Sequence, residues 1–217
     1  MTAEDPVEYN LKGINQVQIN EEIGRTFSAV LRSFLRQDPD VILVGETRDL
    51  ETAQIAIRAA LTGHLVFSTL HTNDAPGTIA RLQDMGIPPF LVASSILLVL
   101  AQRLARRVCK ECRDPYEVDE ESLAPYGHVP QGLGKVTLYK GKGCQACNFT
   151  GMKGRTAIYE VMPISSEMRE LILRGANTTE LRELATQQGM KTLRQAGLLK
   201  VLEGATTAEE ILRVTIG

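Results

Sequence analysis

All four cysteines of this 217-residue chain lie in two Cys-x-x-Cys pairs, Cys109 with Cys112 and Cys144 with Cys147. Two intervening residues allow both sulfurs of a pair to turn toward one point, so two pairs supply the four ligands of a tetrahedral Zn²⁺ site. Residues 113–143 separate the pairs, so the chain must fold back on itself to close the site. Because a closed Cys₄ shell leaves no position for water, we predict a structural metal.

Two alternatives to a metal remain open, namely two disulfide bonds or four unrelated buried thiols. Disulfides need an oxidising compartment, and the N-terminal residues do not form a signal peptide. Unrelated thiols would rarely fall into two equal pairs with none left over. The spacing therefore favours the metal.

Composition narrows the class of protein. Apolar residues make up 43% of the chain and charged residues 23%, which is typical of a soluble globular protein. The net charge of -2 gives no basic field that would attract nucleic acid as the main partner. The longest apolar stretch, residues 90–101, is shorter than the roughly 20 residues that span a bilayer, so we predict a cytoplasmic protein. A polar motif directly follows Met1, and we expect the chain to be part of a larger fold.

Residues 1–107 alternate aliphatic runs with amphipathic stretches, the pattern of an α/β fold. Residues 41–44 and 65–69 are runs typical of buried parallel strands. Between them, residues 50–62 predict a helix that Asp49 caps and Gly63 ends, which gives a strand–helix–strand crossover. Further helices are predicted at residues 26–36, 76–85 and 89–106, the last of which would carry Arg103, Arg106 and Arg107 at its C-terminal end, where cations are favourable.

The rest of the chain divides into two regions. Residues 108–154 hold the cysteine pairs and predict a loop-rich Cys₄ zinc module. Residues 155–217 predict a strand and a helical subdomain, whose helices are expected to share one small apolar core. The predicted helices are residues 166–174, 178–188, 192–202 and 208–214, and two residue pairs have capping-box spacing, Asn177 with Glu180 and Thr206 with Glu209.

Glu46 directly follows the first aliphatic strand. Ligands bind at the carboxyl ends of the strands in parallel α/β sheets, so Glu46 is placed to act as a general base near a phosphate. An ordinary Walker B motif has aspartate before such a glutamate, whereas this chain has Gly45. The strand pattern alone leaves a second interpretation open, an exposed loop glutamate paired with Arg48.

Histidines flank the second strand, His64 before it and His71 after it. A histidine at a strand end can contact a phosphate or transfer a proton. A lone histidine is more often structural, but His71 has the polar neighbours Thr69, Thr72 and Asn73. We therefore favour a functional role for His71 over His64.

Three carboxylates, Glu4, Asp5 and Glu8, lie within one short segment near the N-terminus. Carboxylates together with retained waters suit Mg²⁺ beside a nucleotide phosphate. The alternative is an acidic, solvated turn around Pro6.

Two arginines, Arg32 and Arg36, lie one turn apart on the same face of a predicted helix. They can brace a triphosphate or pair with Asp38 and Asp40, and the sequence does not decide between these interpretations.

Taken in order, these motifs resemble the C-terminal half of the ATPases of bacterial type II secretion and type IV pilus assembly (extension). Residues 4–9, Glu-Asp-Pro-Val-Glu-Tyr, match the family's Asp box, residues 35–49 its unusual Walker B motif, and residues 62–73 its His box. Residues 101–104, the two cysteine pairs and residues 154–160 match its zinc-containing tail. The resemblance covers essentially the whole chain, and a glycine at position 45 is normal for this family. The cysteine pairs favour the secretion or extension branch over retraction motors, which generally lack them.

The resemblance implies a fold and a role for each site residue. The fold would be the C-terminal part of a RecA-like P-loop ATPase core, followed by the Cys₄ module and the helical subdomain. Glu46 would polarise the attacking water, and His71 together with His64 would link the γ-phosphate to subunit movement. The cofactors would be Mg²⁺ and ATP, besides the structural Zn²⁺. Glu4, Asp5 and Glu8 would act around Mg²⁺, and Arg32 and Arg36 would lie near the nucleotide or a subunit interface.

The resemblance also implies a hexameric motor that couples ATP hydrolysis to the assembly of pilin or pseudopilin subunits. Its partners would be inner-membrane platform and anchoring proteins, with no nucleic acid, and the protein would be cytoplasmic and peripheral to the inner membrane. No Gly-x-x-x-x-Gly-Lys-Ser/Thr phosphate loop occurs in the 217 residues. We therefore expect this chain alone to hydrolyse ATP negligibly.

Two interpretations from other classes remain. One is a non-enzymatic, zinc-stapled adapter, which differs from the motor in lacking hydrolysis that depends on Glu46. The other is a zinc-ribbon nucleic-acid binder. Against the second, an acidic segment follows the first cysteine pair and makes a poor phosphate-binding surface; its carboxylates are Asp114, Glu117, Asp119, Glu120 and Glu121.

Overall fold

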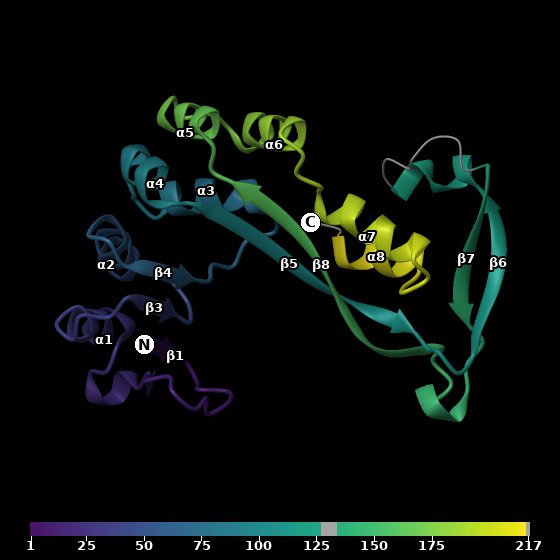
Figure 1. Ribbon diagram of the computed structural model, residues 1–217, viewed down its shortest axis with the longest axis horizontal. Helices are drawn as coiled ribbons and strands as arrows, with labels where there is room; N and C mark the ends of the chain where they lie inside the picture. The colour runs from purple at the N-terminus through teal and green to yellow at the C-terminus, as the bar shows by residue number, and fades with distance from the viewer. Residues whose placement is uncertain (127–133, 216–217) are drawn as a thin grey trace. The chain divides into compact units, whose positions relative to one another are not determined.

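The computed structural model describes residues 1–126 and 134–215 (Figure 1). The chain divides into two compact units. The first unit consists of Met1–Thr72, Pro76–Val99 and Pro163–Leu184. The second consists of Asn73–Ala75, Leu100–Met162 and the chain from Ala185 onward. The segments 1–107, 108–154 and 155–217 therefore do not map one to one onto these units, because the first and last segments contribute to both.

The first unit contains a four-stranded parallel sheet in the order β2-β1-β3-β4. The strands are β1 (Thr2–Glu4), β2 (Gln16–Gln18), β3 (Val41–Val44) and β4 (Leu65–Ser68). Helix α2 (Leu50–Leu61) connects β3 to β4 as the predicted crossover. Since Val44 pairs with Ser68, both strands end at the same edge of the sheet. This edge carries the loops of the candidate site.

Side-chain caps define where the first two α-helices begin. Helix α1 (Phe27–Phe34) follows the short 3-10 helix η1 (Glu21–Ile23) and begins after Thr26, whose side chain accepts a hydrogen bond from the backbone N–H of Ala29. Asp49 caps α2 in the same way, as predicted, by accepting from Thr52 N. Each cap satisfies an N–H group that has no partner within its helix. The apolar face of α1 packs with the sheet in one core, which includes Val30, Leu31, Phe34, Ile42 and Val44, and the α/β fold class is confirmed.

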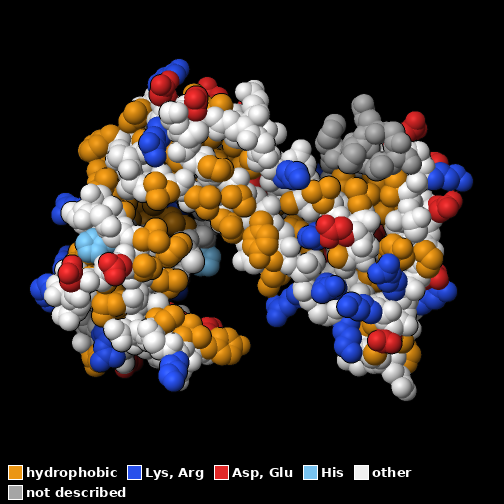
Figure 2. Space-filling model, in the orientation of Figure 1, with side chains coloured by type: hydrophobic (Ala, Val, Ile, Leu, Met, Phe, Trp, Pro, Cys, Tyr) orange, Lys and Arg blue, Asp and Glu red, His pale blue; other side chains and the backbone are white. Residues whose placement is uncertain are grey.

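The predicted helix over residues 89–106 is wrong beyond its first two turns. Helix α4 spans only Pro89–Ser95, and β5 (Leu98–Val108) follows as a strand that pairs with β8 (Met152–Pro163). The side chains of β5 alternate, because Val99, Ala101 and Ala105 are buried while Leu98, Leu100 and Leu104 stay exposed, and apolar side chains are visible over β5 in Figure 2. The pairing with a strand distant in sequence overrides the local helical pattern.

Three further helices belong wholly or mainly to the first unit. Helix α3 (Ala75–Asp84) follows the loop after β4, and α5 (Ser166–Leu173) packs against α4. Helix α6 (Thr178–Gln187) begins with the predicted capping box, in which Asn177 accepts from Glu180 N and donates its own N–H to the Glu180 carboxylate.

The second unit contains most of the paired strands β5 and β8, together with an antiparallel hairpin and two α-helices. Strand β6 (Arg113–Asp119) pairs with β7 (Lys135–Gly141), and short 3-10 helices lie at η2 (Glu120–Tyr126) and η3 (Gln145–Cys147). Helix α7 (Leu193–Leu202) packs against both β7 and α8 (Ala208–Thr215).

Two predictions for the C-terminal helices are wrong. The single helical core is divided, because Ile172 and Leu181 lie in the first unit while Leu198 and Ile211 lie in the second. The cap of α8 is also one residue later than predicted, because Thr207 accepts from Glu210 N. Thr206 instead donates its hydroxyl proton to the carbonyl of Arg106. None of the helices in the described parts of the chain is long and apolar enough to cross a membrane.

Candidate functional site

Glu46 lies at the carboxyl end of β3 with its side chain only 15% exposed. Its two carboxylate oxygens have different partners. His71 Nε2 lies 2.7 Å from one oxygen, and Arg48 Nε donates to the other at 2.5 Å. The predicted contact with Arg48 exists, but Glu46 is not a solvent-exposed loop residue. A partly buried carboxylate held from two sides is suited to orient a water molecule.

The loops after β3 and β4 are held together by hydrogen bonds that fix Glu46 opposite His71. Thr47 donates its N–H to the carbonyl of Thr69 at 2.9 Å, and its hydroxyl lies 2.7 Å from the hydroxyl of Ser68. Thr69 in turn donates its hydroxyl proton to the carbonyl of Gly45 at 2.5 Å. The imidazole of His71 itself is 88% exposed. Its position opposite Glu46 therefore depends on the backbone on either side of it.

His64 lies at the opposite end of β4 from His71. Its Nδ1 is 3.0 Å from the carbonyl of Ala59 and 3.2 Å from the hydroxyl of Thr62, at the C-terminal end of α2. The structure therefore gives His64 a place at the helix end and does not bring it to Glu46.

Gly45 shows why the usual aspartate is missing before Glu46. A Cβ atom at this position would lie 2.9 Å from the carbonyl oxygen of Ala3 and 3.2 Å from Cα of Glu4. The N–H of Gly45 also donates to that same carbonyl at 2.7 Å. Close approach of β1 to the end of β3 therefore excludes any side chain here.

The three N-terminal carboxylates have different surroundings. The Glu4 carboxylate accepts from Gln16 Nε2 at 2.9 Å and from the hydroxyl of Thr2 at 2.6 Å, and these bonds, led by that from Gln16, lower the pKa of Glu4. Asp5 Oδ2 lies 3.9 Å from the guanidinium of Arg48. Glu8 is exposed. Arg48 thus links Asp5 to Glu46, and the carboxylate oxygens of these two residues could serve as ligands for a magnesium ion at this edge.

The two candidate arginines, Arg32 and Arg36, both contact protein groups on helices α1 and α2 in this structure. The guanidinium of Arg32 pairs with the carboxylate of Glu51 at the start of α2, which lowers the pKa of Glu51. Arg36 folds back on its own helix and donates to the carbonyl of Arg32 at 3.0 Å and to the hydroxyl of Ser33 at 3.3 Å. Among the described residues, these contacts replace the predicted alternative pairs with Asp38 and Asp40.

The four cysteines come together as predicted. Their sulfur atoms all lie within 4.8 Å of one another, with separations of 3.9 Å for Cys109 and Cys144, 3.9 Å for Cys112 and Cys147, and 3.8 Å for Cys144 and Cys147. Four ligands at about 2.3 Å in a tetrahedron around Zn²⁺ stand about 3.8 Å apart. The four thiols are free rather than disulfide-bonded, and the donor set fits a closed zinc site.

Backbone N–H groups surround the sulfurs and favour thiolates. Cys147 Sγ accepts from Cys144 N and from Gly151 N, both at 3.2 Å, and Cys112 Sγ accepts from Gly143 N at 3.3 Å. Burial opposes the charge on Cys147, but the two backbone donors and the neighbouring thiols lower its pKa to about 6. Burial raises the pKa of Cys112 to about 12. Thiolates this close repel one another, so a bound dication is needed for all four to ionise together.

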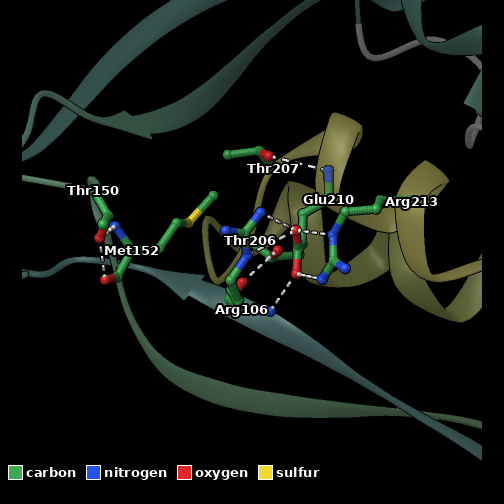
Figure 3. Close-up of polar contacts among 7 residues, drawn as sticks. All are labelled: Arg106, Thr150, Met152, Thr206, Thr207, Glu210 and Arg213. Carbon is green, nitrogen blue, oxygen red and sulfur yellow. Dashed lines mark hydrogen bonds and ion pairs between the residues drawn. The ribbon is translucent and has the colours of Figure 1, made fainter.

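An ionic cluster around one buried carboxylate, that of Glu210, lies in the second unit and was not predicted from the sequence (Figure 3). The Glu210 side chain is 1% exposed and accepts from the guanidinium groups of Arg213 and Arg106, each with a shortest distance of 2.7 Å. Glu210 also accepts from the backbone N–H of Arg106 at 2.8 Å. The bonds from Arg213, and then those from Arg106, outweigh burial and lower the pKa of Glu210 to about 2. No sequence signal could have joined Arg106 to a residue so distant in the chain.

Comparison with known proteins gives consistent matches over the whole chain. The family described as "Type II/IV secretion system protein" matches residues 1–213. The "Type IV pilus assembly ATPase PilB" of Myxococcus xanthus (strain DK1622) is 58% identical over 212 residues, which are 97% of this chain and 38% of that protein. The "Type II secretion system protein E" of Dickeya dadantii (strain 3937) is 52% identical over 215 residues, 99% of this chain and 42% of that protein.

A solved structure extends the similarity to the fold. The pilus retraction motor PilT with bound ADP matches with a TM-score of 0.66 and 30% identity, over 100% of this chain and 52% of that chain. The present chain spans about two fifths of the length of the two curated relatives.

Proposed function

Because this chain belongs to the Type II/IV secretion system protein family, we propose that it is the C-terminal part of a motor ATPase in which Glu46 orients the water that attacks ATP. The family resemblance predicted from the sequence is confirmed, and a relative with 58% identity is named an ATPase. The observation that carries the proposal is the contact of Glu46 with both His71 and Arg48 at the carboxyl ends of β3 and β4.

Each residue of this edge has a separate task in the proposed reaction. Glu46 holds the attacking water and accepts its proton, while His71 senses the phosphate end of the nucleotide from the exposed side. Asp5 and Glu8 offer oxygens to a magnesium ion or its waters, whereas Glu4 is already held by Gln16 and Thr2. Bound Mg²⁺ would neutralise the charge that develops on the phosphates.

The finer features of the proposal follow the family resemblance. The motor would be a homo-hexamer that couples hydrolysis to the assembly of pilin or pseudopilin subunits. It would act from the cytoplasm at the inner membrane, on platform and anchoring proteins. The Cys₄ module would hold Zn²⁺ and stabilise the second unit. Arg32 and Arg36 would lie near the nucleotide or a subunit interface once the ring has formed.

The chain alone is expected to hydrolyse ATP negligibly. Its 217 residues contain no Gly-x-x-x-x-Gly-Lys-Ser/Thr loop to hold the β- and γ-phosphates. The decisive measurement is therefore steady-state ATP hydrolysis by a longer protein that carries this chain behind such a loop.

Two matched carboxylate variants test the role of Glu46 in that longer protein. Glu46→Gln should lower kcat by about 10²-fold or more while nucleotide binding persists, because only the proton acceptor is lost. Glu22→Gln, at an exposed carboxylate of η1, is the control and should retain the kcat of the parent. Unchanged hydrolysis in Glu46→Gln would refute the assignment, and no hydrolysis by a folded, zinc-loaded parent would favour the adapter interpretation.

A further inference from the structure

The short segment Asn73–Ala75, which begins two residues after His71, belongs to a different compact unit from the chain on either side of it. Met1–Thr72 and Pro76–Val99 lie in the first unit, whereas Asn73–Ala75 lies in the second. The chain thus crosses from one unit to the other two residues after His71 and returns at the start of α3.

Two side chains of the second unit hold this short segment. Arg103 of β5 donates from its guanidinium to the carbonyl of Asn73 at 3.0 Å and to the side-chain oxygen of Asn73 at 3.4 Å. Glu160 of β8 accepts from the N–H of Ala75 at 2.8 Å. Glu160 is only 2% exposed, so this contact is shielded from competing water.

Glu160 also receives a second backbone donor, which explains why a carboxylate is present. Its other oxygen accepts from Leu193 N at 3.1 Å. Ala75 and Leu193 are the first residues of α3 and α7, and the first N–H groups of a helix lack partners within it. Negative charge is favourable at both helix ends. A carboxamide has one acceptor oxygen and would turn its NH₂ group toward the other donor.

His71 needs external support because little packs around its imidazole. On its N-terminal side, the hydrogen bonds of Thr69 to Thr47 and to Gly45 fix the backbone. On its C-terminal side, the described anchors are the Arg103 contact with Asn73 and the Glu160 contact with Ala75. Thr72 also lies 2.9 Å, hydroxyl to hydroxyl, from Thr78.

We propose that Arg103 and Glu160 are positioning residues for His71. By holding Asn73 and Ala75, they fix the backbone on the C-terminal side of His71 and so keep its exposed imidazole opposite the carboxylate of Glu46. That Arg103 and Glu160 keep His71 in contact with Glu46, the contact part of this inference, concerns the 217-residue chain alone. Its consequence for hydrolysis rests on the proposed function.

The contact part is tested by NMR of the 217-residue chain. The probe is the change in the imidazole signals of His71 that Glu46→Gln produces, with the signals assigned from His71→Gln. This response should be large in the parent chain. It should fall at least about twofold when Arg103→Gln or Glu160→Gln is already present, because the side chains of His71 and Glu46 then spend less time in contact. Arg106→Gln is the control, since it breaks the Glu210 cluster of the same unit without touching residues 73–75.

The outcomes are separable. The inference is overturned if the His71 signals respond to Glu46→Gln as strongly in Arg103→Gln as in the parent chain. It is also overturned if Arg106→Gln reduces this response equally, because loss of stability alone would then explain the effect. If Glu160→Gln fails to fold, Arg103→Gln decides alone.

In the longer hydrolysing protein, Arg103→Gln should lower kcat roughly tenfold with little change in KM for ATP, because misplacement of a reacting group affects the reaction more than binding. Unchanged kcat beside a reduced NMR response would refute the consequence for hydrolysis, while the Glu46→Gln test judges the proposed function separately.

Discussion

Gly45 is the residue at which β3 comes closest to β1. Gly45→Ala should lower the free energy of unfolding of the first unit by about 1–3 kcal/mol, because the new Cβ would lie 2.9 Å from the backbone of Ala3, which cannot rotate away. It should also loosen the segment that carries Glu4 and Asp5. Denaturant unfolding measures the first effect, and hydrogen exchange of the β1 and β3 amides measures the second.

Gly63→Ala is a suitable control for that experiment. A Cβ at Gly63 meets no atom within 4 Å, although its φ of 105° makes the substitution strained. It should therefore cost stability without faster exchange in β1. Unchanged β1 exchange in Gly45→Ala would show that the two strands accommodate a Cβ atom without loosening and would contradict the steric explanation.

Which candidate side chains meet could be predicted only in part from the sequence. Glu46 and His71 follow adjacent parallel strands, and the ends of such strands meet at one edge, so their meeting was predictable. His64 lies close to His71 in sequence, yet the length of β4 places it at the other edge. The partners of Arg32 and Glu4 depend on side-chain conformations and on residues of other elements, which no local pattern encodes.

The buried carboxylate of Glu210 ties helix α8 to Arg106 of β5. The pKa of Glu210 falls from its ordinary value of 4.5 to about 2 in the folded protein. A lowered pKa contributes stability that is fully present above the unfolded value and is lost as the pH falls through the folded value. The shift corresponds to roughly 3 kcal/mol. Glu210→Gln should therefore destabilise the second unit by a few kcal/mol at pH 7, measured by denaturant unfolding.

The pH dependence makes this prediction specific. The difference in stability between the parent and Glu210→Gln should shrink as the pH falls from about 4.5 toward 2, because the parent then loses its own carboxylate charge. Glu209→Gln, at the exposed neighbouring position, should behave like the parent at every pH. A constant difference between parent and Glu210→Gln across this range would mean that packing rather than charge holds α8.

The misassigned strand β5 shows what local patterns do not contain. Residues 96–106 are rich in leucine, alanine and arginine, which favour helices. Their burial nevertheless follows a period of two, because β8 pairs alongside. A partner roughly fifty residues away in the chain decides between the two structures, and tertiary context overrides propensity in such cases. The same strand carries Arg103 and Arg106, so the error also hid both of their contacts.

For the molecule as a whole, the Cys₄ cluster was predictable and the division into units was not. Four ligands at fixed spacing determine their own meeting point, whatever the rest of the chain does. The units instead depend on which distant segments pack together: residues 73–75 join the second unit, and α5 joins the first. Neither assignment leaves a trace in periodicity or composition.

Removal of the metal should separate the behaviour of the two units. The sulfurs bring together the end of β5, the start of β6 and the chain after β7. Without a cation these segments lose the shared ligand that joins them, so the β6–β7 hairpin loses its anchor. A strong zinc chelator, or Cys147→Ser, should abolish hydrogen-exchange protection in β6 and β7 while β3 and α2, which have their own core, remain protected.

Exchange monitored by mass spectrometry, with zinc content measured in parallel, provides the test, and added Zn²⁺ should restore the chelated parent but not Cys147→Ser. Simultaneous loss of protection in β3 would mean that the chain unfolds as one cooperative unit, and full protection of β6 and β7 after metal removal would show that the hairpin does not depend on the cluster.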